Sequence, residues 1–556
     1  METIVSIINI HDTEDAVFLR PAIKMEPLIC RWFAWSHLLS PIQLAMHITY
    51  RIVPLLQSFV SNPSVHVAAN SDPKMYGGPF VSLSQDDVER VKELIEVTTR
   101  QCAQLMTMAQ DIRSFEGALQ EKATGYSLNE FYSQLPVSLA GMVELLYDTY
   151  HHPSLRFFEA MVYDEHLTEH THEIFLQDVA EADRHFFMST PRLPTANSLS
   201  FPMRFSDERL DVLAATRTRP GSFAQLAHLF DVSQEQLPLF RSFFTDKAPA
   251  RNGDASYPDD GVRMRYFGHA CVLFQSAGTS VLFDPFVSVE EGSDNRFTIN
   301  DLPDFIDYVV ITHSHQDHFS LEMLIQLRHR IGRVLVPANN SGNITDPSMK
   351  LNLMALGFEH IDVLDVLDRV DIPNGHILSL PFTGEHADLS IYSKQAVALT
   401  LAGRKFIFLI DSDGRDPVLY RKLMCKVGAV DALFIGMECH GAPLNWLYEP
   451  VLGKPVNRRN NESRRLSGAD NDRAKRILDE IKAPQVFVYA MGQEPWMKYV
   501  MGLQYEPDSV QLVESTKFLG QCEQAGVQAE RLYISREVIY SNAAQACDTQ
   551  RAPLQA

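Results

Sequence analysis

The sequence predicts an α/β protein in two parts, a mainly helical N-terminal domain (residues 1–250) and a layered α/β domain (residues 260–540). Three observations support this prediction. Helical periodicity dominates the first half, and apolar strand-like runs alternate with helical segments in the second half. Between them, residues 245–261 are rich in Pro, Gly, Asp and Asn and nearly lack apolar side chains, which is typical of a linker.

The N-terminal helices are predicted from the spacing of apolar residues. Residues 88–95 begin an amphipathic helix, and Ser84 supplies a side chain of the kind that caps helix N-termini. Similar periodicity predicts helices within residues 135–150 and 173–187. We therefore expect helices to make up most of this half.

In the second half, strands and helices are expected to alternate. Residues 264–274 and 280–283 should form a hairpin, because two β-rich runs flank a short polar turn. Further strands are predicted at residues 307–311, 333–336, 406–410, 432–437 and 485–489, and helices at residues 321–330, 418–426 and 472–482. This alternation is typical of a layered α/β domain.

Composition restricts the class of protein. A chain of 556 residues with 45% hydrophobic side chains is long enough for two or three folded domains. Its formal net charge of −21 would repel a phosphate backbone over most of the surface, which argues against nucleic-acid binding.

The expected location is the cytoplasm. The seven cysteines are odd in number, scattered and never spaced as CxxC, so they indicate reduced thiols rather than a disulfide framework. Early acidic residues argue against a signal peptide. The most apolar early stretch, residues 27–60, is interrupted by Arg and His side chains, so no membrane span is expected.

Most of the predicted chemistry lies in one short motif. After the strand-like run come His313, His315, Asp317 and His318, three imidazoles and a carboxylate within six positions. Side chains two positions apart on a strand share a face, so the first two histidines can bind one metal ion. A turn would then let Asp317 and His318 bind a second ion beside it.

Further ligands are expected where later strands end. The candidates, each after an apolar run, are Glu385 or His386, Asp411, and His440 or Glu438. Asp284 directly follows the run at residues 280–283. It is either an orienting partner for a ligating histidine or a residue that caps a turn.

The HxHxDH motif after an apolar strand resembles that of the metallo-β-lactamase superfamily, over about residues 264–538. The resemblance implies an αββα sandwich with a dinuclear metal site at one edge. In zinc hydrolases of the superfamily, the third ligand is a histidine preceded by glycine, whereas here Gly384 is followed by Glu385 and then His386. A glutamate ligand would enrich the site in oxygen, which favours non-haem iron.

The Gly-Glu-His-x-Asp-Leu segment at residues 384–389, the helical N-terminal half and the chain length resemble one branch of that superfamily. This branch is the dinuclear iron oxygenases typified by the β-hydroxylase of chloramphenicol biosynthesis. Its members hydroxylate the β-carbon of an amino acid held as a thioester on a nonribosomal peptide synthetase carrier domain. The resemblance implies two iron ions, O2 as co-substrate, an electron donor and a homodimer whose N-terminal half contributes dimer and carrier contacts.

The resemblance also implies a ligand set of histidines and carboxylates for the two irons. One iron would be bound by His313, His315 and Glu385, the other by Asp317, His318 and His440, with Asp411 bridging. The candidate catalytic carboxylates are Glu385, Asp411 and Glu438, the last of which is also the alternative to His440.

Other interpretations remain open from the sequence alone. If His386 rather than Glu385 binds metal, a dinuclear zinc or manganese hydrolase of the lactonase or thioesterase type is favoured, with a metal-bound hydroxide as nucleophile. A non-catalytic binding protein is disfavoured, because such proteins usually lose ligands.

Two further segments have competing interpretations. The H-x-x-E-H pattern at residues 166–170 would suit a zinc ion if helical, although solvated helix residues explain it more simply. The basic residues between Lys454 and Arg465 could contact an acidic carrier domain or its phosphate, or simply form a solvated loop.

Overall fold

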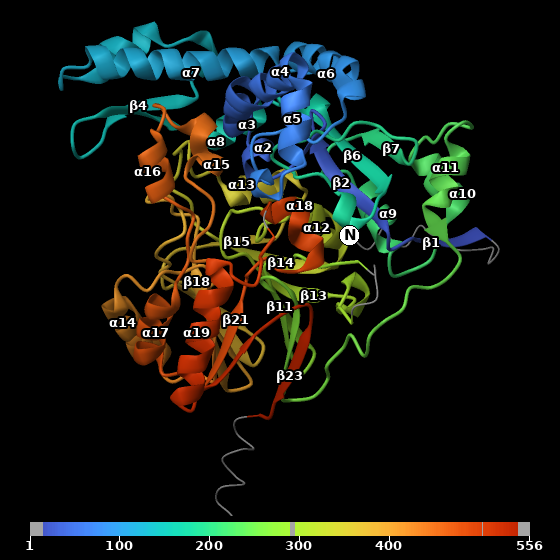
Figure 1. Ribbon diagram of the computed structural model, residues 1–556, viewed down its shortest axis with the longest axis vertical. Coiled ribbons are helices and arrows are strands. Elements are labelled where there is room, and N and C mark those ends of the chain that lie inside the picture. Colours follow the sequence, from blue (N-terminus) through green and yellow to red (C-terminus); the bar gives the residue numbers. More distant parts are fainter. Residues whose placement is uncertain (1–14, 290–294, 503, 543–556) are drawn as a thin grey trace, which may run out of the picture.

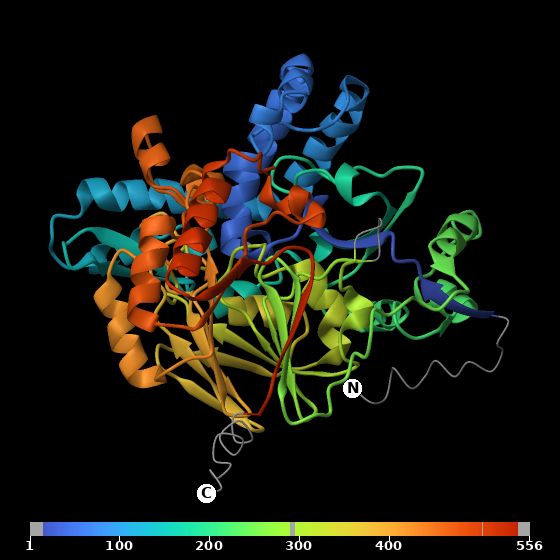
Figure 2. The same ribbon diagram turned by 60° about the horizontal axis from the view of Figure 1, so that its bottom comes forward.

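Figure 1 shows the computed structural model of the chain, which describes residues 15–289, 295–502 and 504–542. In this part of the chain, a pair of seven-stranded β-sheets stacked face to face forms the C-terminal half. The N-terminal half, coloured blue to green, lies along one side of this sandwich (Figures 1 and 2).

The first sheet is antiparallel at one edge and parallel at the other. In spatial order it contains β15 (Ile361–Leu364), β14 (Ile331–Pro337), β13 (Ile306–Val310), β12 (Thr279–Phe283), β11 (Cys271–Ser276), β10 (Val262–Gly268) and β23 (Arg536–Tyr540). The strands from β12 to β15 run parallel, and the others pair antiparallel.

The second sheet has the same pattern. In spatial order it contains β16 (Arg369–Ile372), β17 (Gly375–Leu380), β18 (Ala396–Leu401), β19 (Arg404–Phe408), β20 (Ala432–Gly436), β21 (Gln485–Tyr489) and β22 (Gln528–Arg531). The strands from β19 to β22 run parallel. Most predicted strands of this half are therefore confirmed to within two residues.

Aromatic residues fill the space between the sheets. Phe283 and Phe408 stack with ring centroids 4.1 Å apart, and Phe408 stacks on Phe434 at 4.6 Å. On the outer face of the second sheet, buried residues of α14 (Pro417–Val427), α17 (Asn471–Ile481) and α19 (Val510–Gln524) form a separate core. The first sheet carries α12 (Leu321–Leu327) and α13 (Met349–Ala355). The predicted αββα sandwich is confirmed.

The N-terminal half contains more strand than predicted. Residues 173–187 are not a helix, because β6 (His172–Asp178) lies between β2 (Ile23–Ile29) and β7 (Ser198–Pro202) in an antiparallel sheet. Residues 135–150 contain β4 (Val143–Tyr147) instead of a helix. In the first segment, pairing with the distant β2 outweighs local helical spacing, whereas in the second segment the pairing is a local hairpin with residues 153–157.

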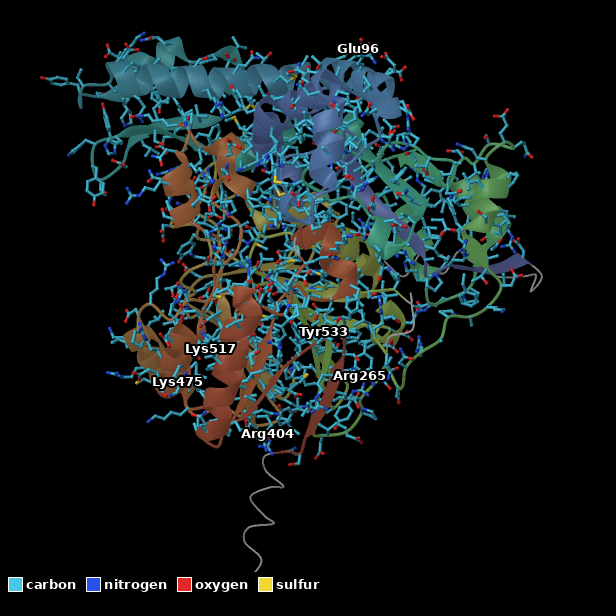
Figure 3. All side chains as sticks on the ribbon, in the orientation of Figure 1. Glu96, Arg265, Arg404, Lys475, Lys517 and Tyr533 are labelled. Atoms are coloured by element: carbon cyan, nitrogen blue, oxygen red, sulfur yellow. The ribbon has the colours of Figure 1, made fainter. Side chains whose placement is uncertain are left out.

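The helix predicted from residue 88 is confirmed as α6 (Val88–Gln101), and Ser84 caps the turn that precedes it. Polar side chains on the outer helices point to solvent, as Glu96 on α6 and Lys517 on α19 do (Figure 3). The longest neighbour, α7 (Ala103–Lys122), extends past the sandwich beside the hairpin of β4 and β5 (Pro153–Phe157) (Figure 1).

The remaining elements are short. The strands are β1 (Ala16–Leu19), β3 (Trp32–Phe33), β8 (Gly221–Ser222) and β9 (Phe244–Thr245). The helices are α2 (Ser36–Leu39), α3 (Pro41–His47), α4 (Val53–Ser61), α5 (Pro63–Asn70), α8 (Glu159–Asp164), α9 (Arg209–Ala215), α10 (Phe223–Leu229), α11 (Leu237–Ser242), α15 (Asn445–Tyr448), α16 (Arg458–Ser463) and α18 (Lys498–Met501). Over the described ranges, none of the helices has the length and apolar character needed to cross a bilayer.

The H-x-x-E-H pattern does not lie on one helix. Helix α8 ends at Asp164, and a separate 3-10 turn covers Glu169–Thr171. The exposed His170 ring contacts the Gln101 carbonyl oxygen at 2.9 Å. The helical i, i+4 geometry that a zinc site would need is therefore missing.

Candidate dinuclear metal centre

The histidine motif lies where the parallel strands β12 to β14 end. The backbone N–H of Ile311 still bonds to Leu335, and the chain then leaves the sheet. The N–H groups of His318 and Phe319 both donate to the carbonyl of His315, forming a tight turn. This turn brings the second half of the motif back toward His313, and all four candidate ligands of the motif are buried.

Ligand-type atoms from three chain segments, residues 313–318, residues 385–386 and Asp411, converge at this point. The distances are 3.7 Å from His313 Nε2 to an Asp411 oxygen, 3.2 Å from His318 Nε2 to the same oxygen, 3.5 Å from His318 Nε2 to Asp317, and 3.0 Å from His315 Nδ1 to Glu385. One group of possible metal ligands contains His313, His315, Glu385 and His386, and another contains His313, His318 and Asp411.

Glu385 and His386 both reach the centre. Their loop is strained, because Glu385, Ala387 and Asp388 all have positive φ, between 54° and 65°. The two side chains lie 3.3 Å apart, from His386 Nδ1 to Glu385 Oε2. The loop therefore presents a carboxylate and an imidazole side by side.

The structure places Glu438, rather than His440, at the metal centre. Strand β20 ends at Gly436, so the alternation expected to put residues 438 and 440 on one face does not continue. Glu438 lines the same small cavity as His315, Asp317 and Glu385, whereas the His440 side chain is exposed. Among the described residues, neither Glu438 nor His440 belongs to the groups of possible ligands, so the preference for Glu438 rests on its place in this cavity.

Neighbouring side chains orient the ligand rings. The carboxylate of Asp284, at the end of β12, accepts from His318 Nδ1 at 2.8 Å and from the Thr312 hydroxyl at 2.6 Å. His318 Nε2 therefore faces the centre. Tyr448 Oη lies 3.0 Å from His315 Nε2, which leaves Nδ1 of that ring toward Glu385.

His269 is a site residue that the sequence analysis missed. Its Nδ1 accepts from the Gly492 N–H at 3.1 Å, and its Nε2 lies 3.1 Å from Asp317 Oδ2. The ring therefore donates to Asp317 through Nε2 and holds this carboxylate in place. It sits in the turn between β10 and β11, a turn that the prediction of one continuous strand at residues 264–274 concealed.

The chemistry of the donor set suits two divalent cations. Within the described part of the chain, His313 Nε2, His318 Nε2, Glu385 Oε2 and Asp411 Oδ1 are buried and make no hydrogen bond of standard geometry. Burial raises the pKa of Glu438 well above its usual range, and the charges of Asp411, Asp317 and Glu385 raise it further. Buried carboxylates that converge in this way need nearby positive charge, which a pair of cations supplies.

Part of the basic segment at residues 454–465 is hydrogen-bonded to the loops of the site. Arg464 Nε donates to the Ala387 carbonyl at 2.9 Å, and Arg465 Nη1 donates to the Gly441 carbonyl at 2.6 Å. These bonds tie the segment to the loops that carry Glu385 and Glu438. Arg458 and Arg459, on α16, are exposed.

The sandwich and its buried centre define a dinuclear metalloenzyme of the metallo-β-lactamase fold. Residues 18–249 match the family model of the diiron non-heme beta-hydroxylase N-terminal domain, and residues 263–398 match that of the beta-lactamase superfamily domain. The chain is 34% identical over 530 residues to the 4-amino-L-phenylalanyl-(CmlP-peptidyl-carrier-protein) 3-hydroxylase of Streptomyces venezuelae, covering 93% of this chain and 98% of that protein.

A solved structure agrees with this similarity. The crystal structure of CmlA, a diiron β-hydroxylase from Streptomyces venezuelae, has a TM-score of 0.87 at 34% identity and covers 94% of this chain and 99% of its own. A metal-dependent hydrolase of Ligilactobacillus salivarius matches at 26% identity over only 28% of this chain and 63% of its own. The chain therefore belongs to the diiron non-haem β-hydroxylases, as the resemblance implied, and not to the zinc hydrolases.

Proposed function

We propose that this hydroxylase uses O2 to hydroxylate the β-carbon of an amino acid held as a thioester on a nonribosomal peptide synthetase carrier domain. The observation that carries the proposal is the near full-length similarity to a hydroxylase whose name specifies a carrier-bound aminoacyl substrate. The carboxylate-rich centre supports it, since mixed imidazole and carboxylate ligands suit non-haem iron.

We propose a ligand set that differs from the sequence prediction at one position. One iron would be bound by His313, His315 and Glu385, the other by Asp317, His318 and Glu438, with Asp411 between them. Glu438 replaces His440, because only Glu438 faces the centre.

The chain's own residues would control how the centre reacts. Two ferrous ions, when bound, supply the electrons that activate O2. Glu385 lies on a strained loop beside His386 and can change how it contacts the centre when substrate arrives. His269, Asp284 and Tyr448 hold the rings and carboxylates in orientation. The burial of the motif excludes bulk water around the reacting atoms.

The proposal includes partners and location. Residues 260–540 would form the catalytic domain, and residues 1–250 would supply the homodimer contacts and part of the carrier surface. The exposed Arg458 and Arg459 are suitable contacts for an acidic carrier domain. An external electron donor would reduce the centre. The seven scattered cysteines support a reducing, cytoplasmic location.

The first experiment measures metal content and O2 consumption after chemical reduction, with a screen of carrier-bound amino acids. We expect about two irons per chain, as a two-metal site requires, with O2 uptake and a product 16 mass units heavier, the mass of one oxygen atom. Zinc at the same stoichiometry, no O2 uptake after iron reconstitution and hydrolysis of the thioester would refute the proposal.

A further inference from the structure

A second, larger cavity lies next to the metal centre. The cavity that contains Glu385 and Glu438 has a volume of only about 40 Å³, too small for an amino acid. The larger one, which we call the outer cavity, measures about 670 Å³. This volume falls within the roughly 300–1,000 Å³ typical of small-molecule sites. Its walls come from α4, α5, the loop at residues 77–80 and α15.

Helix α15 separates the two cavities. The Trp446 side chain lines both of them. Two positions later on the same helix, Tyr448 contacts the candidate ligand His315 at 3.0 Å. Helix α15 thus carries Tyr448, which contacts a candidate metal ligand, and Trp446, which lines the outer cavity. A ligand bound in the outer cavity would be separated from the metal centre by the Trp446 side chain.

The indole of Trp446 contacts two aromatic rings, those of Phe186 and Phe187, and one backbone carbonyl. It stacks on Phe186 with ring centroids 5.5 Å apart, and its Nε1–H donates to the Gly77 carbonyl at 3.0 Å. Because the ring lines both cavities, a rotation of it would join the two spaces.

The outer cavity also offers a partly buried cation, which shares the cavity wall with the Glu449 carboxylate. Arg51, in the π-helical segment Ile48–Ile52, donates through Nη2 to the Asn445 carbonyl at 2.9 Å. Its Nη1 is buried and has no hydrogen-bond partner among the described residues. Buried donors are rarely left without an acceptor, so the cavity suits a ligand that carries amide carbonyl oxygens.

We propose that the outer cavity binds the pantetheine arm of the carrier domain, with Arg51 donating to an amide carbonyl of the arm and Trp446 turning aside to admit the aminoacyl end. The proposal rests on the proposed function, since a carrier-bound substrate must reach a buried centre on a tether. Pantetheine is a slender chain with two amides, which matches a mostly apolar cavity in which Arg51 Nη1 is, among the described residues, the buried donor that lacks a partner.

The test compares two substitutions on α4. Ser58 lines the outer cavity and Ser61, one turn further along, does not, while both side chains are exposed. Ser58→Trp should therefore fill the cavity at the cost of the 3.2 Å contact between Ser58 Oγ and His66 Nε2, and Ser61→Trp is its matched control. The substrates are an aminoacyl pantetheine thioester and the corresponding N-acetylcysteamine thioester, which lacks most of the arm.

We expect Ser58→Trp to raise KM for the pantetheine thioester by about tenfold or more, equivalent to roughly 1.4 kcal/mol. KM for the short thioester, iron content and the behaviour of Ser61→Trp should stay at wild-type levels. Equal effects of Ser58→Trp on both thioesters, or none on either, would overturn the proposal.

A result that refutes the proposed function can be distinguished from one that refutes the pantetheine site. If the wild type hydroxylates no thioester, the function is refuted, and the cavity is tested by calorimetric titration of pantetheine itself. Binding to the wild type and to Ser61→Trp, but not to Ser58→Trp, would support the arm site. Absent or equal binding in all three proteins would overturn it.

Discussion

At the scale of single residues, we propose that the choice between Glu385 and His386 as ligand determines which metal the centre selects. Both side chains reach the centre, but Glu385 Oε2 is the atom that lies 3.0 Å from His315 Nδ1. A carboxylate at this position adds negative charge and oxygen to a set that would otherwise suit zinc.

We predict that Glu385→Gln loses iron at one of the two positions, because a neutral amide is a poor ligand. His386→Gln should retain both irons. The loss in Glu385→Gln should exceed the roughly 10–100-fold drop in affinity typical of an outer partner. Chelator competition and metal analysis measure it, and the reverse order of the two variants would show that His386 is the ligand.

Glu438 and His440 form a second contrasting pair. Glu438→Gln should remove one iron and abolish O2 uptake, because its carboxylate lines the cavity at the centre, close to the charges of Asp411 and Asp317. His440→Gln should behave as wild type, since its side chain is exposed. Iron analysis of both variants is decisive, and iron loss in His440→Gln would restore the ligand set predicted from sequence.

His269 acts on the centre through Asp317. His269→Ala should leave the fold intact but lower the affinity for one iron by roughly 10–100-fold, the usual cost of losing an outer hydrogen bond to a ligand. His269→Gln, which can still donate from its amide, should recover part of this loss. Unchanged iron affinity in His269→Ala would show that the 3.1 Å contact with Asp317 does not orient this ligand.

At the scale of elements, the loops after the strands position the ligands. Asp411 follows β19, Glu438 follows β20, and the motif follows β13, so parallel strands bring them to one edge of the two sheets. The loop at residues 384–388 depends on a special backbone conformation, which begins at Gly384 with φ of 108°.

Gly384→Ala tests this dependence. A Cβ at this position would lie 2.5 Å from Asp413 Cβ, at a φ that L-residues rarely adopt. We expect a loss of about 2 kcal/mol or more in the free energy of unfolding, together with lower iron content. Gly278→Ala is the control, because its φ is also positive at 82° but nothing lies within 4 Å of its Cβ. Equal urea midpoints for the two variants would contradict the account of strain.

At the scale of the whole molecule, buried ion pairs join the two halves. Glu26 on β2 contacts Arg192 at 2.7 Å and Arg184, and Arg184 also contacts Glu322 on α12 at 2.8 Å. Burial would raise the pKa of Glu26, but Arg192 and Arg184 outweigh it and lower this pKa to about 2.

This pKa predicts how stability depends on pH. A carboxyl whose pKa is depressed on folding stabilises the protein above its unfolded value of 4.5, and this contribution is lost as pH falls toward 2. The contribution is on the order of 3 kcal/mol. Glu26→Gln should therefore lower the free energy of unfolding at pH 7 by about 3 kcal/mol and flatten its fall between pH 4.5 and 2.

The matched control is Glu89→Gln, which removes an exposed pair with Lys92. Urea denaturation at pH 7, 5 and 3 should show wild-type behaviour for this control. If the free energy of unfolding of Glu26→Gln depended on pH as that of the wild type does, the ion pairs of Glu26 would not be the cause of the loss of stability in acid.

Local patterns in the sequence were sufficient for much of this protein. Apolar runs located most strands of the sandwich, and the spacing of His313, His315, Asp317 and His318 located the centre, because strand and turn geometry act within a few residues. Gly384 followed by Glu385 indicated iron rather than zinc for the same reason, since ligand type is a property of the side chain itself.

Only the tertiary structure decided the rest. The sheet of β2, β6 and β7, the position of Glu438 in the cavity, and the contact of His269 with Asp317 all depend on contacts between residues far apart in the chain. The His269–Asp317 contact spans 48 residues, and β6 pairs with β2 across more than 140 residues. Such pairings depend on how the whole chain packs, which local periodicity does not encode.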